Sequence, residues 1–412
     1  MADIGLLLMY VASFFGLFTA LYFLLTLFEN KSQLKSPEPK YFPTVTIIVP
    51  AYNEEETIAD TLDSILALDY PKNKLTIMVI DDGSTDKTYA IAKKYAAQGI
   101  VSYSKKNEGK GIALNFALSK TDSDLVGALD ADSYVDSNAL KRIVGFFENE
   151  NVMAVTPSMK IWSPKSVWQK VQMIEYLVGI FLRKVFAFFG SIHVTPGPFT
   201  IYRKSFFDKY GGYDHSTITE DIEIALRIQK NNYIIENSVD AFVYTKGPKD
   251  FGPLFRQRIR WYRGFLDNVI KYRSLFGRKH GNLGLFILPS SFFSVFLVIM
   301  ILIYTLFKWS VDAYEKFFNW YYIGFDLSYL LDFKLDPFFI NLQGIVFLAV
   351  ISLASSFFVI YIAKRLGQDS TKIKISYVLY FFIYWLLFGT WWIVAIYYKI
   401  SGKKIAWAGR MM

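Results

Sequence analysis

Residues 75–84 read LTIMVIDDGS, an apolar run rich in β-branched side chains that stops at two aspartates, a glycine and a serine. Residues 125–132 read LVGALDAD and repeat this order, with the apolar run first and the acids last. Runs of this length and composition are typical of buried strands. Both stretches therefore predict a strand that carries carboxylates at its carboxyl end.

The segments around these two stretches alternate between strand and helix patterns. Strands are predicted at Val45–Pro50, Leu75–Ile80, Ile100–Tyr103 and Leu125–Leu129, and helices at Glu54–Leu68, Thr88–Tyr95 and Gly111–Ser119. This alternation indicates an α/β fold with a mostly parallel sheet and helices on both faces. Ligands of such sheets bind at the carboxyl ends of the strands, which is where the acids lie.

Composition excludes several classes of site. The 412 residues include no cysteine and three histidines, so a disulfide framework and a thiolate site are excluded and a histidine-rich zinc centre is not expected. The formal net charge of +9 fits contact with membrane lipids or with a phosphate-rich substrate. The sequence has no helix-turn-helix, RNA-recognition or zinc-finger pattern, so nucleic acid is not an expected partner.

Four apolar runs are long enough to cross a bilayer. The first, Ile4–Phe28, carries no charge, and we expect a retained anchor rather than a cleaved signal peptide. The others are Leu283–Phe307, Phe338–Ala363 and Ser376–Tyr398. Lysines follow the first run at positions 31, 35 and 40. By the positive-inside rule the next segment is cytoplasmic, which predicts a multi-pass protein of the cell membrane with a cytoplasmic α/β domain.

The predicted domains follow from these runs. They are a membrane anchor at 1–30, the α/β domain at 44–250, an interface region at 251–282, and a membrane block with a cytosolic tail at 283–412. Charge raises one conflict, because the acidic loop Trp309–Pro337 fits the outside while the basic tail after Tyr398 fits the cytoplasm. Four simple crossings would put that tail outside. Three explanations stay open: one run is re-entrant, the aromatic stretch Phe317–Tyr329 enters the bilayer, or the charge rule fails here.

A further long segment, Val167–Phe189, mixes apolar residues with charged ones. Its polar members are Gln169, Lys170, Gln172, Glu175, Arg183 and Lys184. This mixture favours an amphipathic helix at the membrane interface. A buried helix of the soluble domain is the alternative, because both kinds of helix have one apolar face.

The acids at the predicted strand ends are candidates for ligand binding. Asp130 and Asp132 repel each other unless a cation or hydrogen-bond donors intervene, and hard oxygen ligands favour Mg²⁺ or Mn²⁺ bridged to substrate phosphates. Asp82 has a structural alternative, because Asp, Gly and Ser are common where a turn leads into a helix. Lys110 follows Asn107-Glu108-Gly109 before a predicted helix and could approach phosphate. A plain glycine turn with a solvated lysine is the alternative.

Two later motifs also carry reactive side chains. Glu220 and Asp221 follow Thr219 at the start of a predicted helix, where one carboxylate could act as a general base and the alternative is a helix cap. Residues 256–263 combine several cations with Gln257 and Trp261 before a membrane run. Arginine can hold phosphate and an indole can pack on a sugar ring, whereas snorkelling at lipid headgroups would explain the charge alone.

In this order the motifs resemble the membrane-embedded family-2 glycosyltransferases, the group that contains cellulose, chitin, hyaluronan and poly-N-acetylglucosamine synthases. The resemblance runs from about Val45 to Trp261 and into the flanking apolar runs. It is carried by the motifs Pro50–Glu54, Asp81–Ser84, Asp130–Asp132, Thr219–Asp221 and Gln257–Trp261.

The resemblance implies a GT-A (Rossmann-like) fold and a role for each motif. The donor nucleotide would contact Ala51, Tyr52, Glu54, Asp82, Asp130 and Arg260, with Lys110 near its phosphates. Asp132 would hold Mg²⁺ or Mn²⁺, and Asp221 beside Glu220 would be the base. The acceptor would contact Gln257, Trp261 and the loop Gly197-Pro198-Phe199. Trp407–Arg410 is similar to a tail motif of hyaluronan synthases that lies near the nucleotide.

The activity that the resemblance implies is sugar transfer with inversion at the anomeric carbon. The donor is a nucleotide-diphosphate sugar, with UDP favoured, and the acceptor is a growing polysaccharide at the cytoplasmic membrane face, with export coupled to synthesis. The small membrane block keeps transfer to a lipid-linked acceptor open as an alternative. A third hypothesis is an inactive nucleotide-binding scaffold, against which the intact acidic motifs argue.

Overall fold

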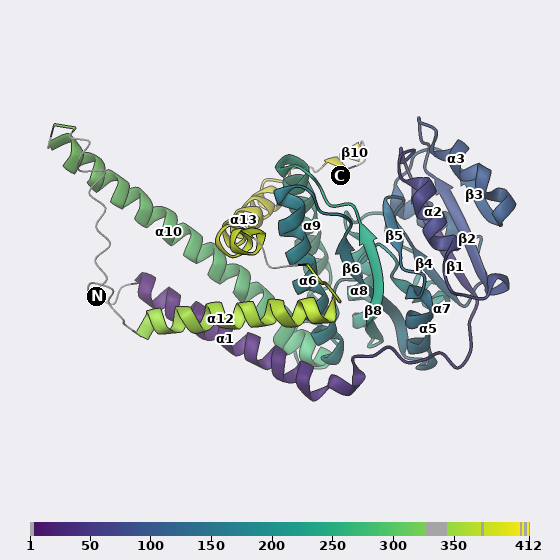
Figure 1. The fold of residues 1–412 in the computed structure, drawn as a ribbon, viewed down its shortest axis with the longest axis horizontal. Coiled ribbons are helices and arrows are strands. Elements are labelled where there is room, and N and C mark those ends of the chain that lie inside the picture. Colours follow the sequence, from purple (N-terminus) through teal and green to yellow (C-terminus); the bar gives the residue numbers. More distant parts are fainter. Residues whose placement is uncertain are drawn as a thin grey trace.

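The computed structural model describes residues 4–322, 324–325, 344–371, 375–403, 406–407 and 410–411. A sheet domain lies at one end of the molecule and long helices extend from the other, with α6 (Val167–Phe188) and α9 (Phe251–Lys271) between them (Figure 1). This arrangement confirms the predicted α/β domain between apolar helices. Within the predicted acidic loop, residue 323 and the residues from 326 onward lie outside the described residues, as do residues 408 and 409 of the tail motif.

Eight strands form one sheet in the order β3-β2-β1-β4-β7-β6-β8-β5. They are β1 (Val45–Ala51), β2 (Leu75–Asp81), β3 (Ile100–Ser104), β4 (Leu125–Ala128), β5 (Ser133–Val135), β6 (Val152–Ile161), β7 (Ile201–Arg203) and β8 (Ile234–Thr245). The first four are parallel, as predicted. However, β7 runs antiparallel to β4 and β6, and β5 runs antiparallel to β8. The sheet is therefore mixed rather than mostly parallel.

The two longest strands, β6 and β8, are not evident from the sequence pattern. Their parallel pairing shifts register between Thr156 and Ser158, on either side of Pro157. At this irregularity Asn237 Nδ2 donates to the carbonyl of Thr156 at 3.0 Å. Proline and buried polar side chains are typical of loops in a sequence, but here they satisfy one another at a bulge.

Different helices cover the two faces of the sheet. One face carries α2 (Ile58–Leu66), α3 (Thr88–Lys94) and α5 (Ala139–Val144), and the other carries α4 (Lys110–Leu118), α7 (Lys204–Tyr210) and α8 (Glu220–Lys230). Alternation along β1 sends Ile47 and Val49 to the first face and Ile48 to the second. All three are at most 1% exposed, and each such burial contributes about 1.5–3 kcal/mol. The strand ends that carry the acids are thus held by packing on both sides.

Four helices of the described chain are long and apolar enough to cross a membrane. They are α1 (Ile4–Glu29), α10 (Leu288–Tyr322) after the π-helical turn Leu283–Ile287, α12 (Gly344–Leu366) and α13 (Ile375–Ile400). They lie near the predicted runs and indicate a multi-pass membrane protein. The cytoplasmic location of the sheet domain stays a prediction.

The predicted interface segment forms α6, a layer between the sheet and the apolar helices. One side packs on β8 through Val239, and the other packs on α12 through Ala363. Lys184 is 1% exposed and donates from Nζ to the carbonyl of Asn237 at 3.2 Å. The buried-helix alternative therefore describes the sheet side of α6, while its contact with lipid stays a prediction.

Candidate active site

The carboxyl ends of β1, β2 and β4 lie together at one edge of the sheet, and the predicted acids lie there. The amide of Asp82 donates to the carbonyl of Ala51 at 2.8 Å, and the amide of Leu129 donates to that of Ile48 at 2.9 Å. These bonds fix Asp82 and Asp130 on either side of β1. Sequence reasoning predicts this placement because parallel strands end at a common edge.

Residues that follow β1 differ in their access to a ligand. Ala51 is 2% exposed, whereas Tyr52 is 36% exposed and Glu54 is half-buried. Glu54 Oε2 accepts a hydrogen bond from Thr57 Oγ1 at 2.7 Å. Tyr52 and Glu54 thus offer side chains at this edge, while Ala51 could contribute only its backbone. Their contact with a nucleotide stays a prediction.

Asp82 organises the loop before α4. It is 4% exposed, and its carboxylate accepts from Lys105 Nζ at 2.8 Å and from the amides of Glu108 and Gly109 at 3.0 and 2.7 Å. A carboxylate with three donors is satisfied within the protein. Asp82 therefore acts on the site through this loop, and direct contact with the nucleoside stays a prediction.

Lys110 connects the two halves of the predicted site. Its Nζ lies 2.5 Å from Asp130 Oδ1 and 3.5 Å from Glu220 Oε1. A Cβ placed on Gly197 would lie 3.1 Å from this Nζ, so the predicted acceptor loop approaches the same point. Removal from water lowers the pKa of Lys110, but the Asp130 and Glu220 carboxylates raise it above its usual range. The lysine is therefore a cation at the junction of four distant segments.

Asp132 occupies a crowded acidic position two residues beyond Asp130. Removal from water, together with the negative charges of Asp130 and Glu54, raises the pKa of Asp132 from 3.8 to about 6. Its Oδ1 accepts a hydrogen bond from Ser133 Oγ at 3.2 Å, which opposes this rise. The carboxylate thus lies where added positive charge would stabilise its ionised form.

The donor set at this edge fits a divalent cation. Asp130 and Asp132 offer carboxylate oxygens, and Mg²⁺ commonly takes one or two carboxylates together with water and substrate phosphates. Burial, together with the Asp130 and Glu54 carboxylates, raises the pKa of Asp132, and a bound cation would oppose this rise. Among the described residues no group of three or more His, Cys, Asp or Glu side chains is placed to hold a metal. Water and substrate phosphates are the ligands that would complete the coordination of such a cation.

Asp221 opens α8 beside Glu220, on the other side of Lys110. Removal from water and the Glu220 charge raise the pKa of Asp221 from 3.8 to about 6, while Arg260 and Lys110 lower it. Its backbone carbonyl accepts from Thr195 Oγ1 at 2.7 Å. A general base works best with a pKa near the operating pH, which this carboxylate meets better than an ordinary aspartate.

The helix-cap alternative for this motif does not describe the bonds of Thr219. Thr219 precedes α8 but makes no side-chain cap hydrogen bond. Its Oγ1 instead accepts from Asn268 Nδ2 of α9 at 3.0 Å. Arg260 of α9 donates from Nη1 to the carbonyl of Ile218 at 3.1 Å. The start of α8 is thus positioned by α9.

Arg258 anchors α9 on the membrane side of the site. It is 0% exposed, and its Nη2 lies 2.6 Å from Glu175 Oε2 of α6. The predicted acceptor residues both engage it, because Gln257 Oε1 accepts from Arg258 Nη1 at 2.7 Å and the Trp261 ring centroid lies 4.2 Å from the guanidinium carbon. Gln257 and Trp261 remain half-buried, and their contact with an acceptor stays a prediction.

Only part of the predicted acceptor loop is open to a ligand. Gly197 is half-buried beside Lys110, whereas Pro198 and Phe199 are buried. The Phe199 ring is 0% exposed in the core, its φ is 63°, and its amide donates to the carbonyl of Ala128 at 2.5 Å. In this structure Phe199 shapes the loop from below rather than presenting a ring to a sugar.

Sequence reasoning misses four residues that shape this site. They are Lys105, Glu175, Tyr176 and Arg258. Removal from water and the charges of Glu175 and Asp132 raise the pKa of Tyr176 to about 12, although Arg258 lowers it, so α6 lies close to Asp132. Helical spacing could have indicated a separate role for Arg258, because it lies two residues from Arg260 and residues two apart face nearly opposite sides of a helix.

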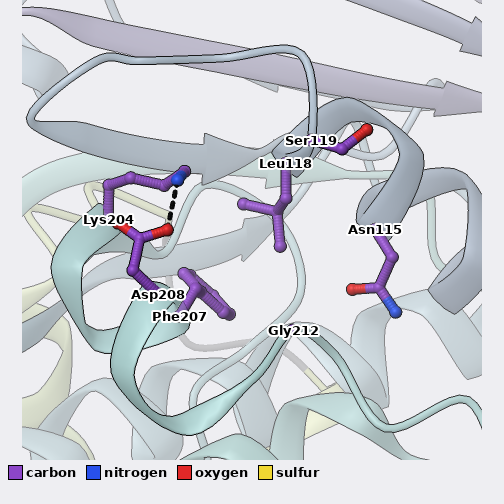
Figure 2. A pocket seen from close by; sticks show the side chains of 7 residues that line it. All are labelled: Asn115, Leu118, Ser119, Lys204, Phe207, Asp208 and Gly212. Atoms are coloured by element: carbon purple, nitrogen blue, oxygen red, sulfur yellow. Dashed lines mark hydrogen bonds and ion pairs between the residues drawn. The ribbon is translucent and has the colours of Figure 1, made fainter.

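Two cavities lie outside the acid cluster. The first, about 220 Å³, lies between α4 and α7, and Figure 2 shows its lining side chains, with Leu118 and Phe207 near an ion pair of Lys204 and Asp208. It contains no predicted site residue. The second, about 240 Å³, lies between the loop 214–218, α9 and Lys403, and borders the Arg260 contact at Ile218.

Comparison with known proteins gives consistent matches. Residues 46–211 match the model of Glycosyl transferase family 2. A poly-beta-1,6-N-acetyl-D-glucosamine synthase of Staphylococcus epidermidis is 32% identical over 240 residues, covering 57% of this chain and 58% of that protein. A synthase of the same description from Staphylococcus aureus (strain COL) is 34% identical over 225 residues, covering 53% and 54%. The chain thus spans somewhat more than half the length of these relatives.

A solved structure shares the fold over nearly the whole chain. It is a mannosyltransferase from Pyrobaculum calidifontis in complex with GDP-Man and Mn²⁺, with a TM-score of 0.58 and 19% identity. The alignment covers 97% of this chain and 99% of that one.

Proposed function

We propose that this chain is a family-2 glycosyltransferase that extends a polysaccharide at the cytoplasmic membrane face; the match of residues 46–211 to Glycosyl transferase family 2 and the similarity to poly-β-1,6-N-acetyl-D-glucosamine synthases support this proposal. The donor would be a UDP-sugar, with N-acetylglucosamine as the transferred unit by analogy with those relatives. The observation that carries this proposal is the junction at Lys110, where Asp130 and Glu220 meet within 3.5 Å of one ammonium group.

The proposed reaction needs a base for the acceptor hydroxyl and cationic side chains that bind the diphosphate. Asp221 would take the proton of an acceptor hydroxyl while that oxygen bonds to the anomeric carbon. The bond from this carbon to the diphosphate oxygen breaks, and its electron pair leaves with the nucleotide diphosphate. Attack opposite the leaving group inverts the anomeric configuration. Lys110 and Arg260 would bind the diphosphate, because cations held among carboxylates and carbonyls are already oriented.

Asp132, with Asp130, would hold Mg²⁺ or Mn²⁺. The bound ion would supply positive charge against the departing diphosphate. The mannosyltransferase of this fold was solved with Mn²⁺, which supports the choice of metal to test first.

The variant Asp221→Asn tests the proposal. We expect transfer from labelled UDP-N-acetylglucosamine to fall by about 10²–10⁴-fold, with donor binding retained. Asp208→Asn is the matched control, because Asp208 forms an ion pair with Lys204 at the cavity of Figure 2, whose lining includes none of the acid cluster. Normal transfer by Asp221→Asn, or loss of donor binding in that variant, would contradict the assignment.

A second candidate is transfer of a single sugar to a lipid-linked acceptor. The small number of long apolar helices in the described chain favours it, because a polymer needs a path across the membrane. Product size separates the two candidates. High-molecular-weight product that resists lipid extraction supports polymerisation, whereas a small extractable product supports the second candidate.

A further inference from the structure

Although α13 is apolar enough to span a bilayer, it packs on α6 near its start and on α9 in its second half, and at Gly389 it also contacts Val298 and Leu302 of α10. Near its first turn Tyr377, 1% exposed, packs with Ile174 of α6. In the second half, Trp392 stacks on Tyr262 of α9, with ring centroids 4.7 Å apart and planes at 12°. In the last turn, Lys399 forms an ion pair with α9. The first turn of α13 thus lies against α6, and its second half and last turn lie against α9.

The length of α13 makes this pattern incompatible with a simple crossing. Tyr377 and Lys399 are 22 residues apart, which corresponds to about 33 Å of helix, more than the roughly 30 Å of a hydrocarbon core. If α13 crossed, α6 and α9 together would have to reach from one membrane surface to the other.

Neither partner helix can lie in the hydrocarbon. Between them α6 and α9 carry the charged residues Lys170, Glu175, Arg183, Lys184, Arg256, Arg258, Arg260, Arg263, Asp267 and Lys271. A charged side chain at the bilayer centre costs at least about 2.5–3.5 kcal/mol. The two helices therefore stay on the domain side of the membrane, and α13 stays with them.

The exposed residues of α13 form one face. The exposed large apolar residues of α13, between 37% and 81% exposed, are Val378, Phe382, Ile383, Ile393, Tyr397 and Ile400. At about 100° per residue they fall on one side of the helix, opposite the side that packs on the domain. Figure 1 shows α1 and α12 running alongside each other away from the sheet, whereas α13 is seen along its axis beside α9.

We infer that α13 lies in the membrane plane beneath the catalytic domain, with its exposed apolar face on the lipids of the domain-side leaflet. Of the four long apolar helices in the described part of the chain, α1, α10 and α12 then cross and α13 does not, so the chain after α13 returns to the side of the catalytic domain. This resolves the charge conflict in the sequence, because Lys399 and Lys403 then lie on the same side of the membrane as the catalytic domain, where the positive-inside rule places basic residues. Lys403 lines the 240 Å³ cavity beside α9, and β10 (Arg410–Met411) lies on the domain side of α13 (Figure 1).

Single cysteines test this arrangement, because the chain has none of its own. The variants are Ser401→Cys after α13, Ser119→Cys in the sheet domain and Asn319→Cys near the end of α10, all at exposed positions. In sealed cells exposed to a membrane-impermeant maleimide, we expect Ser401→Cys to behave as Ser119→Cys does and opposite to Asn319→Cys. Labelling of Ser401→Cys together with Asn319→Cys would overturn the inference.

A depth measurement gives an independent check if a variant folds poorly. Spin labels on Phe382→Cys and Ile393→Cys lie 11 residues apart, which is about 16 Å along the helix. For a helix in the membrane plane, collision rates with oxygen and with a water-soluble nickel chelate give the two labels the same depth. Depths that differ by most of that distance would overturn the inference. Neither readout depends on the proposed activity.

Discussion

Two opposite charges flank Asp221, and they offer a directional test of its role as base. Removal from water, and then the Glu220 charge, raise the pKa of Asp221 from 3.8 to about 6, while Arg260 acts in the opposite direction. This rise corresponds to about 3 kcal/mol at 1.36 kcal/mol per unit. If transfer requires the carboxylate, roughly nine tenths of it is ionised at pH 7 and one tenth at pH 5, so the rate should fall about tenfold between these values.

The acidic limb of the pH–rate profile is the part where the rate falls as Asp221 becomes protonated. Removing either neighbour should move this limb in a defined direction. Glu220→Gln removes a negative charge, lowers the pKa of Asp221 and moves the limb to lower pH. Arg260→Gln removes a positive charge, raises that pKa and moves the limb to higher pH. Lys110 stays in both variants, so the sign of the movement comes from the altered residue.

The assay is initial transfer rate from pH 5 to pH 8, at saturating donor and divalent cation, with each profile scaled to its own maximum. Asp132 also has a pKa of about 6, so Glu54→Gln serves as the discriminating control, because Glu54 raises the pKa of Asp132 and not that of Asp221. A limb that moves with Glu54→Gln but with neither neighbour of Asp221 would refute the base assignment.

Three other outcomes follow from the contacts of the site. Lys110→Ala should weaken nucleotide binding by roughly tenfold or more, because a charge-assisted bond to phosphate is lost, and Lys110→Arg should recover part of it in the same binding assay. Asp82→Ala should speed hydrogen exchange at the amides of the loop before α4; unchanged exchange would show that Asp82 does not hold that loop. Arg258→Met should lower the free energy of unfolding by about 3–5 kcal/mol, because it leaves the Glu175 carboxylate unpaired. The double variant with Glu175→Met should recover most of the loss in thermal unfolding, and equal loss in both would contradict the pairing.

The first half of the sheet could be predicted because its strands alternate regularly with helices. β1 and β2 end within one residue of their predicted limits, and the acids after β2 and β4 share one edge as parallel topology requires. β6 and β8 could not be predicted, since their pairing depends on a bulge at Pro157 and on the bonds of Asn237 across it. Such polar groups look like a loop until the partner strand is known.

The site was predictable as a set of acids but not as a network of bonds. Asp130 and Asp221 are recognisable from their motifs. The position of Lys110 between them is not, because its Nζ lies 2.5 Å from the Asp130 carboxylate and 3.5 Å from that of Glu220 only as a result of tertiary packing. Lys105 has no motif of its own, and only the fold brings it to Asp82. Long-range ion pairs of this kind carry no local sequence signal.

Arg258 and Arg260 of α9 have different partners because they are two residues apart. On a helix that spacing places Arg258 and Arg260 on nearly opposite faces. Arg260 therefore reaches the carbonyl of Ile218 and the field of Asp221, while Arg258 turns to Glu175 of α6. Trp261 follows Arg258 by three residues and therefore lies on the same face of α9, where its ring lies against the Arg258 guanidinium. A shift of α9 would then move the proposed diphosphate contact of Arg260 and the ring of Trp261 together, which would couple the geometry of transfer to the position of this helix.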